Sequence, residues 1–271
     1  MKIQLEQLES ELQNAIQCDS YKSENGCKNY ESISTVIDFI KRNTDHFQGD
    51  ALKSLIFVIG ATGAGKSTLV NYLNSPDNIV ASNVEGKLQV TDNSIAEIGD
   101  GSGSTTLYPN TLTSPFGTFL DCPGEGDTRG IIAETFKSII KSRISNSTKK
   151  VKILLVASYA SLGSEGGYGT IFKNSLDKNA QFLRDIQYFK TSMAFVITSA
   201  GRRENALENS VELINVMLNK HAHLGAYKDI VSHVVSSGNI AIFSRPSDDL
   251  KIGEKYRPPQ WNPNQKEKLS K

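Results

Sequence analysis

Short apolar runs alternate with amphipathic segments through most of the chain. Four near-continuous apolar runs predict buried strands: Leu55 to Ile59, Val151 to Ala157, Met193 to Thr198 and Ile240 to Phe243. A further strand is predicted to end at Asp121. Apolar residues at three- and four-residue spacing predict helices between the runs, over residues 131–144, 171–189 and 205–218. Apolar strands separated by helices are typical of a mostly parallel sheet covered on both faces, so the pattern predicts a three-layer α/β fold.

Two amphipathic segments precede the first apolar run. Residues 1–17 carry leucine or isoleucine at positions 5, 8, 12 and 16, and residues 31–43 carry isoleucine or valine at positions 33, 36, 37 and 40. Both patterns predict helices. Either the two helices pack on the domain that follows, or the first belongs to a helical arm or self-association surface. Residues 1–50 are therefore expected to form an N-terminal helical extension.

The other end of the chain is polar. Residues 248–271 contain Pro258, Pro259 and Pro263, and they form either a linker or a segment that wraps the domain. The expected organisation is thus an extension over 1–50, one α/β domain over 51–247 and a polar tail over 248–271.

A polar and broken stretch follows the first strand and helix, up to about residue 104. Within it, Lys87 to Thr91 and Ile95 to Ile98 predict a short hairpin across Asp92-Asn93. Residues 99–106 are rich in glycine and serine and end in hydroxyl side chains, which indicates a flexible loop.

The junction between the first strand and its helix carries the most specific chemical motif. Residues 60–68 read Gly60, Ala61, Thr62, Gly63, Ala64, Gly65, Lys66, Ser67, Thr68. This is the phosphate-binding loop (P-loop) G-x-x-x-x-G-K-[ST], in the strand–loop–helix context that the motif requires. Glycines let the backbone N–H groups wrap around phosphate, and the helix start adds its positive dipole end. Lys66 is expected to bridge the β- and γ-phosphates, and the Ser67 hydroxyl to ligate Mg²⁺.

A second motif, D-x-x-G, lies where a later strand ends. Asp121 is placed to hold Mg²⁺ through water, and Gly124 to offer its backbone N–H to a γ-phosphate. The carboxyl ends of parallel strands share one edge of a sheet and form its ligand site. Thr198 and Ser244, which stand at two further strand ends, are therefore expected to contribute to nucleotide binding.

Composition narrows the setting without changing this picture. The chain has 271 residues, and 30 basic against 29 acidic side chains give a net charge of +1. No global field favours nucleic acid or an anionic membrane. The three cysteines form no C-x-x-C pair, the N-terminus has no apolar signal core, and no apolar run is long enough to span a membrane. A cytoplasmic protein is expected, and peripheral membrane association is compatible with it.

These motifs together resemble those of a P-loop GTPase of the translation-factor class. Their residues are most similar to the motifs of septin-like and immunity-associated (AIG-type) G domains. The matching stretches are residues 60–68, Ser104-Thr-Thr106 and Asp121-Cys-Pro-Gly-Glu-Gly-Asp-Thr-Arg-Gly130. The resemblance implies a G domain that binds GTP and Mg²⁺, with a switch threonine at Thr105 or Thr106. Thr106 is preferred because it precedes Asp121 by 15 residues (121 − 106), which is close to the short spacing in that family. The implied metal ligands are Ser67, Thr106 and Asp121, and the implied catalytic residues are Lys66, Thr106, Gly124 and Glu125.

Two positions depart from that family. Gly201 stands where the guanine-reading aspartate is expected, so ATP stays open as an alternative to GTP. Glu125 replaces the water-orienting glutamine that follows D-x-x-G in Ras-like enzymes, which predicts slow hydrolysis, or hydrolysis completed by a partner or by dimerisation. Arg129, Arg202 and Arg203 are either solvated or able to reach a transferring phosphoryl group.

Three functions are compatible with these residues. The first is a Mg²⁺-dependent nucleoside-triphosphatase switch for GTP. The second is a nucleotide-dependent scaffold without turnover. The third is a P-loop ATPase, although the stretch from Leu162 to Gly167 is a poor match to the L-S-G-G-Q motif of transporter-type ATPases. The expected partners are a nucleoside triphosphate, a second copy across the nucleotide face and a protein bound through the N-terminal helices. No nucleic acid and no transmembrane segment are expected.

Overall fold

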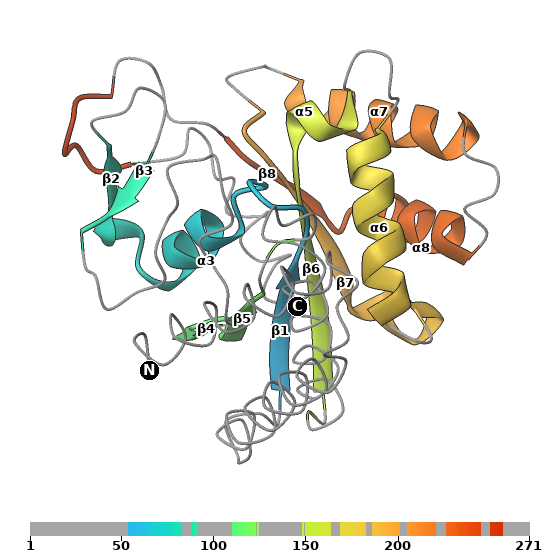
Figure 1. The fold of residues 1–271 in the computed structure, drawn as a ribbon, viewed down its shortest axis with the longest axis horizontal. Helices are drawn as coiled ribbons and strands as arrows, with labels where there is room; N and C mark the ends of the chain where they lie inside the picture. Colours follow the sequence, from blue (N-terminus) through green and yellow to red (C-terminus); the bar gives the residue numbers. More distant parts are fainter. Residues whose placement is uncertain are drawn as a thin grey trace, which may run out of the picture.

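A six-stranded sheet with helices on both faces forms the body of the molecule (Figure 1). The computed structural model describes residues 54–82, 88–91, 110–122, 124, 148, 150–163, 169–182, 186–200, 205–220, 226–244 and 250–256. The expected helices over 1–17, 31–43 and 131–144, the loop over 99–106 and the tail beyond residue 256 lie outside these residues.

The central sheet has the strand order β4-β5-β1-β6-β7-β8. Its strands are β1 (Ser54–Ile59), β4 (Asn110–Ser114), β5 (Gly117–Asp121), β6 (Lys150–Ser158), β7 (Met193–Thr198) and β8 (Ile240–Phe243). Neighbouring strands are parallel except for β4, which pairs antiparallel with β5 through a tight turn. The prediction of a mostly parallel sheet is therefore confirmed.

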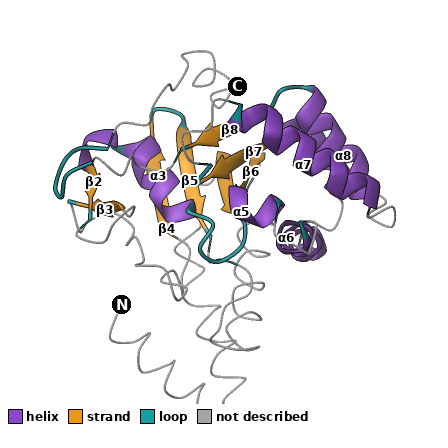
Figure 2. Ribbon diagram, turned by 90° about the horizontal axis from the view of Figure 1, so that it is seen from above, coloured by secondary structure: helices purple, strands orange, loops and turns teal. Residues whose placement is uncertain are grey.

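The helices form the two outer layers, which is plain in the view from above (Figure 2). One face of the sheet carries α3 (Lys66–Asn74). The opposite face carries α5 (Tyr159–Leu162), α6 (Thr170–Phe182), α7 (Ala206–Lys220) and α8 (Ala226–Ser236). Strand residues alternate between two buried clusters: Phe57, Ile153 and Phe195 point toward α6 to α8, whereas Val58, Leu154 and Val196 point toward α3. The predicted three-layer α/β architecture is present.

A small second sheet and the segment 250–256 extend the α3 side. A 3-10 helix (Pro76–Asn78) leads into β2 (Ile79–Ala81), which pairs antiparallel with β3 (Leu88–Val90). Segment 250–256 runs along β2: Ala81 N–H donates to Glu254 O at 2.9 Å, and Tyr256 N–H donates to Ile79 O at 2.8 Å. These residues therefore wrap the domain.

Tyr256 anchors that segment in the core. Its side chain is 2 % exposed and packs edge-on against Tyr72 of α3 and Phe243 of β8, with ring centroids 5.9 and 5.8 Å away. Its hydroxyl donates to Ser244 O. Burial raises the pKa of Tyr256 above its usual range, and Tyr72 adds to the effect, so the phenol stays a donor at neutral pH. One side chain thus joins the first helix, the last strand and the segment beyond it.

Several elements differ from the sequence-based expectations. The single helix expected over 171–189 is wrong: α6 ends at Phe182, and a 3-10 helix occupies Ile186–Ser192. The apolar spacing of a short 3-10 helix is too close to that of an α-helix to separate the two. Four strands and α-helices were not predicted, namely β2, β4, α5 and α8, and neither was the 3-10 helix Pro76–Asn78. The predicted strand over 87–91 is present as β3, but its expected hairpin partner, 95–98, lies outside the described residues.

We expect Tyr256→Ala to lower the free energy of unfolding by about 3 kcal/mol, because a large buried ring is lost. Lys255→Ala is the matched control. It removes an exposed ion pair with Asp77 (3.2 Å), which contributes about 1 kcal/mol at most. Urea denaturation measures both, and equal losses would contradict the anchoring role of Tyr256.

Candidate functional site

The loop from Gly60 to Gly65 connects β1 to α3 and passes close over β6. Gly60 has φ +145°, and a Cβ atom there would lie 2.0 Å from Val156 O. No side chain fits at that distance, so only glycine lets the backbone leave β1 in this direction. The first glycine of the motif is thus required by the approach of the loop to the sheet.

The loop delivers the chain into the N-terminus of α3. Gly65 is the N-cap residue, and neither a capping side chain nor an acidic residue satisfies the first turn within the described part of the chain. A helix start of this kind, with its backbone N–H groups and positive dipole end, suits an anion. Lys66, which is 6 % exposed, folds its ammonium over the loop and donates to Gly60 O and Ala61 O, both at 3.0 Å.

Asp121 ends β5 directly beside this loop. It pairs with Val58 of β1, and Cys122 N–H donates to Val58 O at 3.2 Å, so the strand is held against β1 to its last residue. The Asp121 side chain is fully buried. Neither of its carboxylate oxygens accepts a hydrogen bond of good geometry from the residues that the structure describes.

Burial raises the pKa of the Asp121 carboxyl, and the Lys66 ammonium and the Ser67 hydroxyl oppose that rise. Ser67 lies close enough to lower the pKa without forming a well-aligned hydrogen bond to the carboxylate. Desolvation is the largest of the three effects, so a further cation beside the carboxylate would favour its charged form.

Gly124 closes the site from the side of β5. A Cβ atom at this position would lie 2.6 Å from Thr62 Cα and 2.6 Å from Thr62 Oγ1. The D-x-x-G glycine therefore lies directly on the phosphate-binding loop, and a larger residue would push the two segments apart.

Thr198 supports the loop from the end of β7. Its hydroxyl donates to Ala64 O at 2.7 Å, and a weaker contact reaches Ala157 O at 3.4 Å. The side chain is buried, so its observed contact is with the loop backbone. Ser199, which follows, has φ +57° and donates its N–H to Phe243 O at 3.1 Å. A non-glycine residue in this conformation is uncommon and marks the end of β7 as a constrained turn.

The structure thus brings together most of the residues that the sequence singled out: residues 60–68, Asp121, Gly124 and Thr198. Ser244, half-buried, lies next to them at the end of β8 and is held by Tyr256. Thr106 and Glu125, and with them Gly201 and the three arginines, lie outside the described residues. Sequence reasoning missed Val156 and the contact of Tyr256. It named Ala64 as part of the loop but did not predict that its backbone carbonyl accepts a hydrogen bond from Thr198.

The residues present fit a magnesium ion. A buried carboxylate that lacks a well-aligned hydrogen bond from any described residue, beside a serine hydroxyl and a phosphate-binding loop, matches the usual Mg²⁺ site of one or two carboxylates completed by phosphates and water. In the described ranges, no group of three His, Cys, Asp or Glu side chains gathers to hold a metal. Phosphate oxygens and water are therefore needed to complete the shell.

The comparisons with known proteins bear on the fold. No protein-family model and no curated protein matches the sequence. Among solved structures, one of the chloroplast translocon components Toc33 and Toc159 aligns over 88% of this chain and 88% of its own, with 16% identity and a TM-score of 0.51. A dimerization-deficient mutant of Toc33 from Arabidopsis thaliana aligns over 88% of this chain and 89% of its own, with 15% identity and a TM-score of 0.49. Era from Aquifex aeolicus aligns over 71% of this chain and 51% of its own, with 18% identity and a TM-score of 0.33.

The chain therefore has the fold of a P-loop GTPase domain. At these identities the likeness shows the fold alone, and the narrower resemblance to septin-like and immunity-associated domains stays a prediction. None of the helices within the described segments is long and apolar enough to cross a membrane.

We expect Asp121→Asn to raise the melting temperature of the metal-free protein at neutral pH, because it removes the cost of burying a charge. A carboxyl whose pKa is higher in the folded than in the unfolded chain stabilises the fold at a pH below its unfolded-state pKa. It loses that contribution as the pH rises through its folded-state pKa. Wild type should therefore lose stability over that pH range more than Asp121→Asn does.

Thermal unfolding at several pH values, in EDTA and in Mg²⁺ with nucleoside triphosphate, measures both effects. Stabilisation by Mg²⁺ with nucleotide should be largely lost in Asp121→Asn. A metal-free variant less stable than wild type at neutral pH would show instead that the attraction of Lys66 outweighs desolvation.

Proposed function

We propose that this chain is a Mg²⁺-dependent guanine-nucleotide switch that binds GTP and hydrolyses it slowly. The observation that carries the proposal is the fully buried Asp121 carboxylate, which lies beside Lys66 and the phosphate-binding loop without a well-aligned hydrogen bond from any described residue. A buried charge of this kind is costly unless the site takes up a cation together with an anion.

The phosphates are held by the loop and the start of α3. Backbone N–H groups of residues 60–68 surround the anion, and the Lys66 ammonium exchanges its two carbonyl acceptors, Gly60 O and Ala61 O, for phosphate oxygens. Ser67, Thr106 and Asp121 are the proposed ligands of Mg²⁺. When bound, the ion neutralises charge that develops on the phosphates during transfer.

The switch acts through Gly124. Because Gly124 lies directly against Thr62, a movement of Gly124 would displace the phosphate-binding loop. In the proposed cycle, contacts with the γ-phosphate order residues 99–106 and 124–130, and hydrolysis releases them. Thr106 and Gly124 are the residues through which the γ-phosphate is sensed.

Guanine is the proposed base because the fold is shared with the chloroplast translocon components, which have GTPase activity. Gly201 in place of the usual aspartate argues for weak discrimination against ATP. Ser244 is proposed to contact the base from the end of β8, and Thr198 to act on the nucleotide by holding Ala64.

Hydrolysis is proposed to be slow because Glu125 adds negative charge where Ras-like enzymes place a glutamine. In the chloroplast translocon components, dimerization is important for the GTPase activity. By analogy, a second copy across the nucleotide face is proposed to complete this site. A cytoplasmic location fits the cysteine pattern. A nucleotide-dependent scaffold without turnover is the second candidate, which Glu125 and Gly201 favour.

Single-turnover hydrolysis of labelled GTP tests the proposal. The protein is in excess over GTP, and phosphate release is measured at several protein concentrations. Wild type should release phosphate, faster at high concentration if dimerization contributes. We expect Lys66→Ala to slow release by about 100-fold or more, since it removes a charge that acts on the transferring phosphate.

Lys173→Ala is the matched control, because Lys173 lies on α6 in an i,i+4 pair with Asp177 (2.7 Å) and should leave the rate unchanged. Circular dichroism confirms that each variant is folded. Phosphate release absent in wild type at every concentration, with GTP bound, would replace the switch with the scaffold.

A further inference from the structure

The two faces of the central sheet are covered unequally within the described part of the chain. Four helices lie on one face, α5 to α8, whereas α3 and the segment 250–256 cover the other (Figures 1 and 2). α3 packs on β1, β4 and β5, and Leu73 in its last turn reaches a cavity. This cavity lies over the half of the sheet where β1, β6 and β7 begin, and no helix among the described residues covers it.

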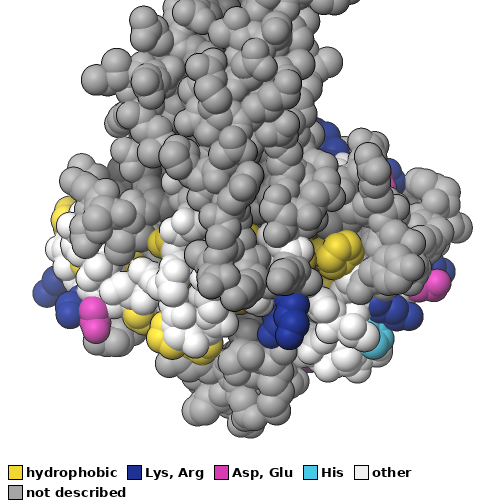
Figure 3. All heavy atoms as spheres, turned by 90° about the horizontal axis from the view of Figure 1, so that it is seen from below, with side chains coloured by type: hydrophobic (Ala, Val, Ile, Leu, Met, Phe, Trp, Pro, Cys, Tyr) yellow, Lys and Arg dark blue, Asp and Glu magenta, His cyan; other side chains and the backbone are white. Residues whose placement is uncertain are grey.

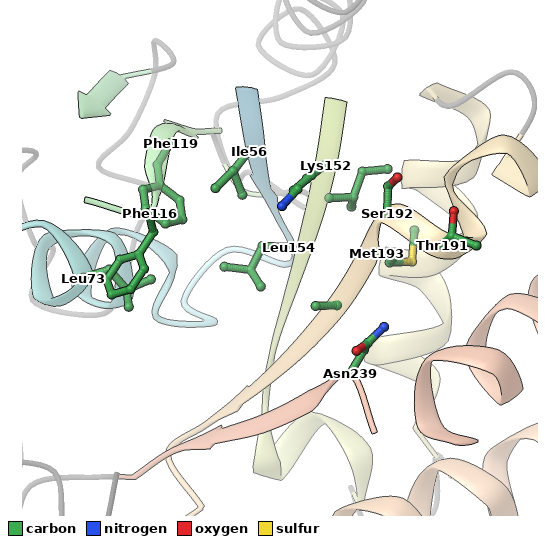
Figure 4. A pocket seen from close by; sticks show the side chains of 12 residues that line it. Ile56, Leu73, Phe116, Phe119, Lys152, Leu154, Thr191, Ser192, Met193 and Asn239 are labelled. Atoms are coloured by element: carbon green, nitrogen blue, oxygen red, sulfur yellow. The ribbon is translucent and has the colours of Figure 1, made fainter. Parts of the chain in front are cut away.

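This cavity, of about 280 Å³, has a mainly apolar floor that also contains Lys152, which pairs with Ile56 in the sheet, and it has polar residues at its rim. Figure 4 shows Ile56 and Leu154 of the sheet between Leu73 and Phe116 on one side and Thr191 on the other. Ile56, Phe116 and Ala194 are only partly buried, although each packs on the α3-side core. Strands in a mostly parallel sheet are normally covered on both faces, so this apolar floor needs a cover.

The shape and position of the cavity favour a helix over a small molecule. Its volume lies at the lower limit of the roughly 300–1,000 Å³ of typical ligand pockets. It also lies at the opposite end of the strands from the phosphate-binding loop. A mainly apolar floor, with Lys152, Thr191 and Asn239 as polar lining residues, suits an amphipathic helix, which buries one stripe and keeps the other faces in water. In the view from below, which faces the side where the strands begin, apolar side chains of the described residues reach the surface (Figure 3).

We propose that residues 31–43 of the same chain form a helix whose apolar stripe occupies this groove. The stripe consists of Ile33, Val36, Ile37 and Ile40, and Arg42 points from the opposite side of the helix. The segment enters the domain at the right place, because β1 begins at Ser54 and its third residue, Ile56, lies in the groove floor.

Chain length allows this docking. A helix over residues 31–43 is roughly 20 Å long at 1.5 Å per residue. The connecting residues 44–53 reach up to roughly 33 Å when extended, which is enough to turn back onto the floor beside β1. Intramolecular docking also has the advantage of a high effective concentration over a partner in solution.

The test places a reporter thiol in the groove of the full chain. Ala194→Cys is made in a background with Cys18→Ser and Cys27→Ser, and modification of position 194 by a small maleimide is followed by mass spectrometry. Ile37→Asp puts a charge in the stripe, and Arg42→Asp puts the same charge on the opposite side. We expect Ile37→Asp to speed modification at least about tenfold, a factor that corresponds to about 1.4 kcal/mol, and Arg42→Asp to leave it unchanged.

Cys122, which is fully buried, reports unfolding in the same molecule and should stay unmodified. If Ile37→Asp exposes Cys122, the milder Ile37→Ser replaces it in the same comparison. Equal rates of modification at position 194, with and without the change at Ile37, would overturn the proposal. Two fast rates would mean that the groove is open, and two slow rates would mean that something else covers it. A parent rate that rises on dilution would assign the groove to a second copy and overturn it as well.

Discussion

A carboxylate, an ammonium and a phosphate-binding loop share one buried space at the end of the sheet, and the rest of the site depends on how their charges are balanced. Asp121 is fully buried, and burial raises the pKa of its carboxyl more than the nearby Lys66 ammonium lowers it. Lys66 in turn donates its hydrogen bonds to two loop carbonyls. In the proposed function Mg²⁺ would add positive charge beside Asp121 and phosphate would add negative charge beside Lys66, so the site is expected to bind both at once.

The loop can hold this arrangement because the sheet supports it from three strands. Val156 O of β6 lies where a side chain at Gly60 would be, Thr198 of β7 holds Ala64, and Asp121 of β5 pairs with Val58 next to the loop. Gly124 then rests on Thr62 from the opposite side. Contacts from separate strands leave the loop little freedom, so a displacement of Gly124 would be transmitted to the phosphate-binding loop by direct contact with Thr62.

Much of the fold and of the site was predictable from residue patterns. The remainder was not predictable, and the reasons are physical. The apolar runs predicted β1, β6, β7 and β8, because buried parallel strands are apolar throughout. The edge strand β4 was missed, since Leu112 is its only apolar residue. The helix α8 was missed despite Ile230, Val231 and Val234 at helical spacing, which is a usable signal. In the site, motifs identified the side chains, but the backbone carbonyls of Val156 and Ala64 have no signature in a sequence. The anchoring of Tyr256 is a long-range contact within a polar tail, which local patterns do not predict.

Binding of magnesium and nucleotide as one unit is the central claim, and calorimetric titration of the wild-type chain measures it most directly. Titrations with GTP and with ATP, each in excess Mg²⁺ and in EDTA, should show tight binding only with Mg²⁺ and stronger binding of GTP. Binding of equal strength in EDTA and in Mg²⁺ would contradict the role assigned to Asp121, and stronger binding of ATP would contradict the assignment of the base.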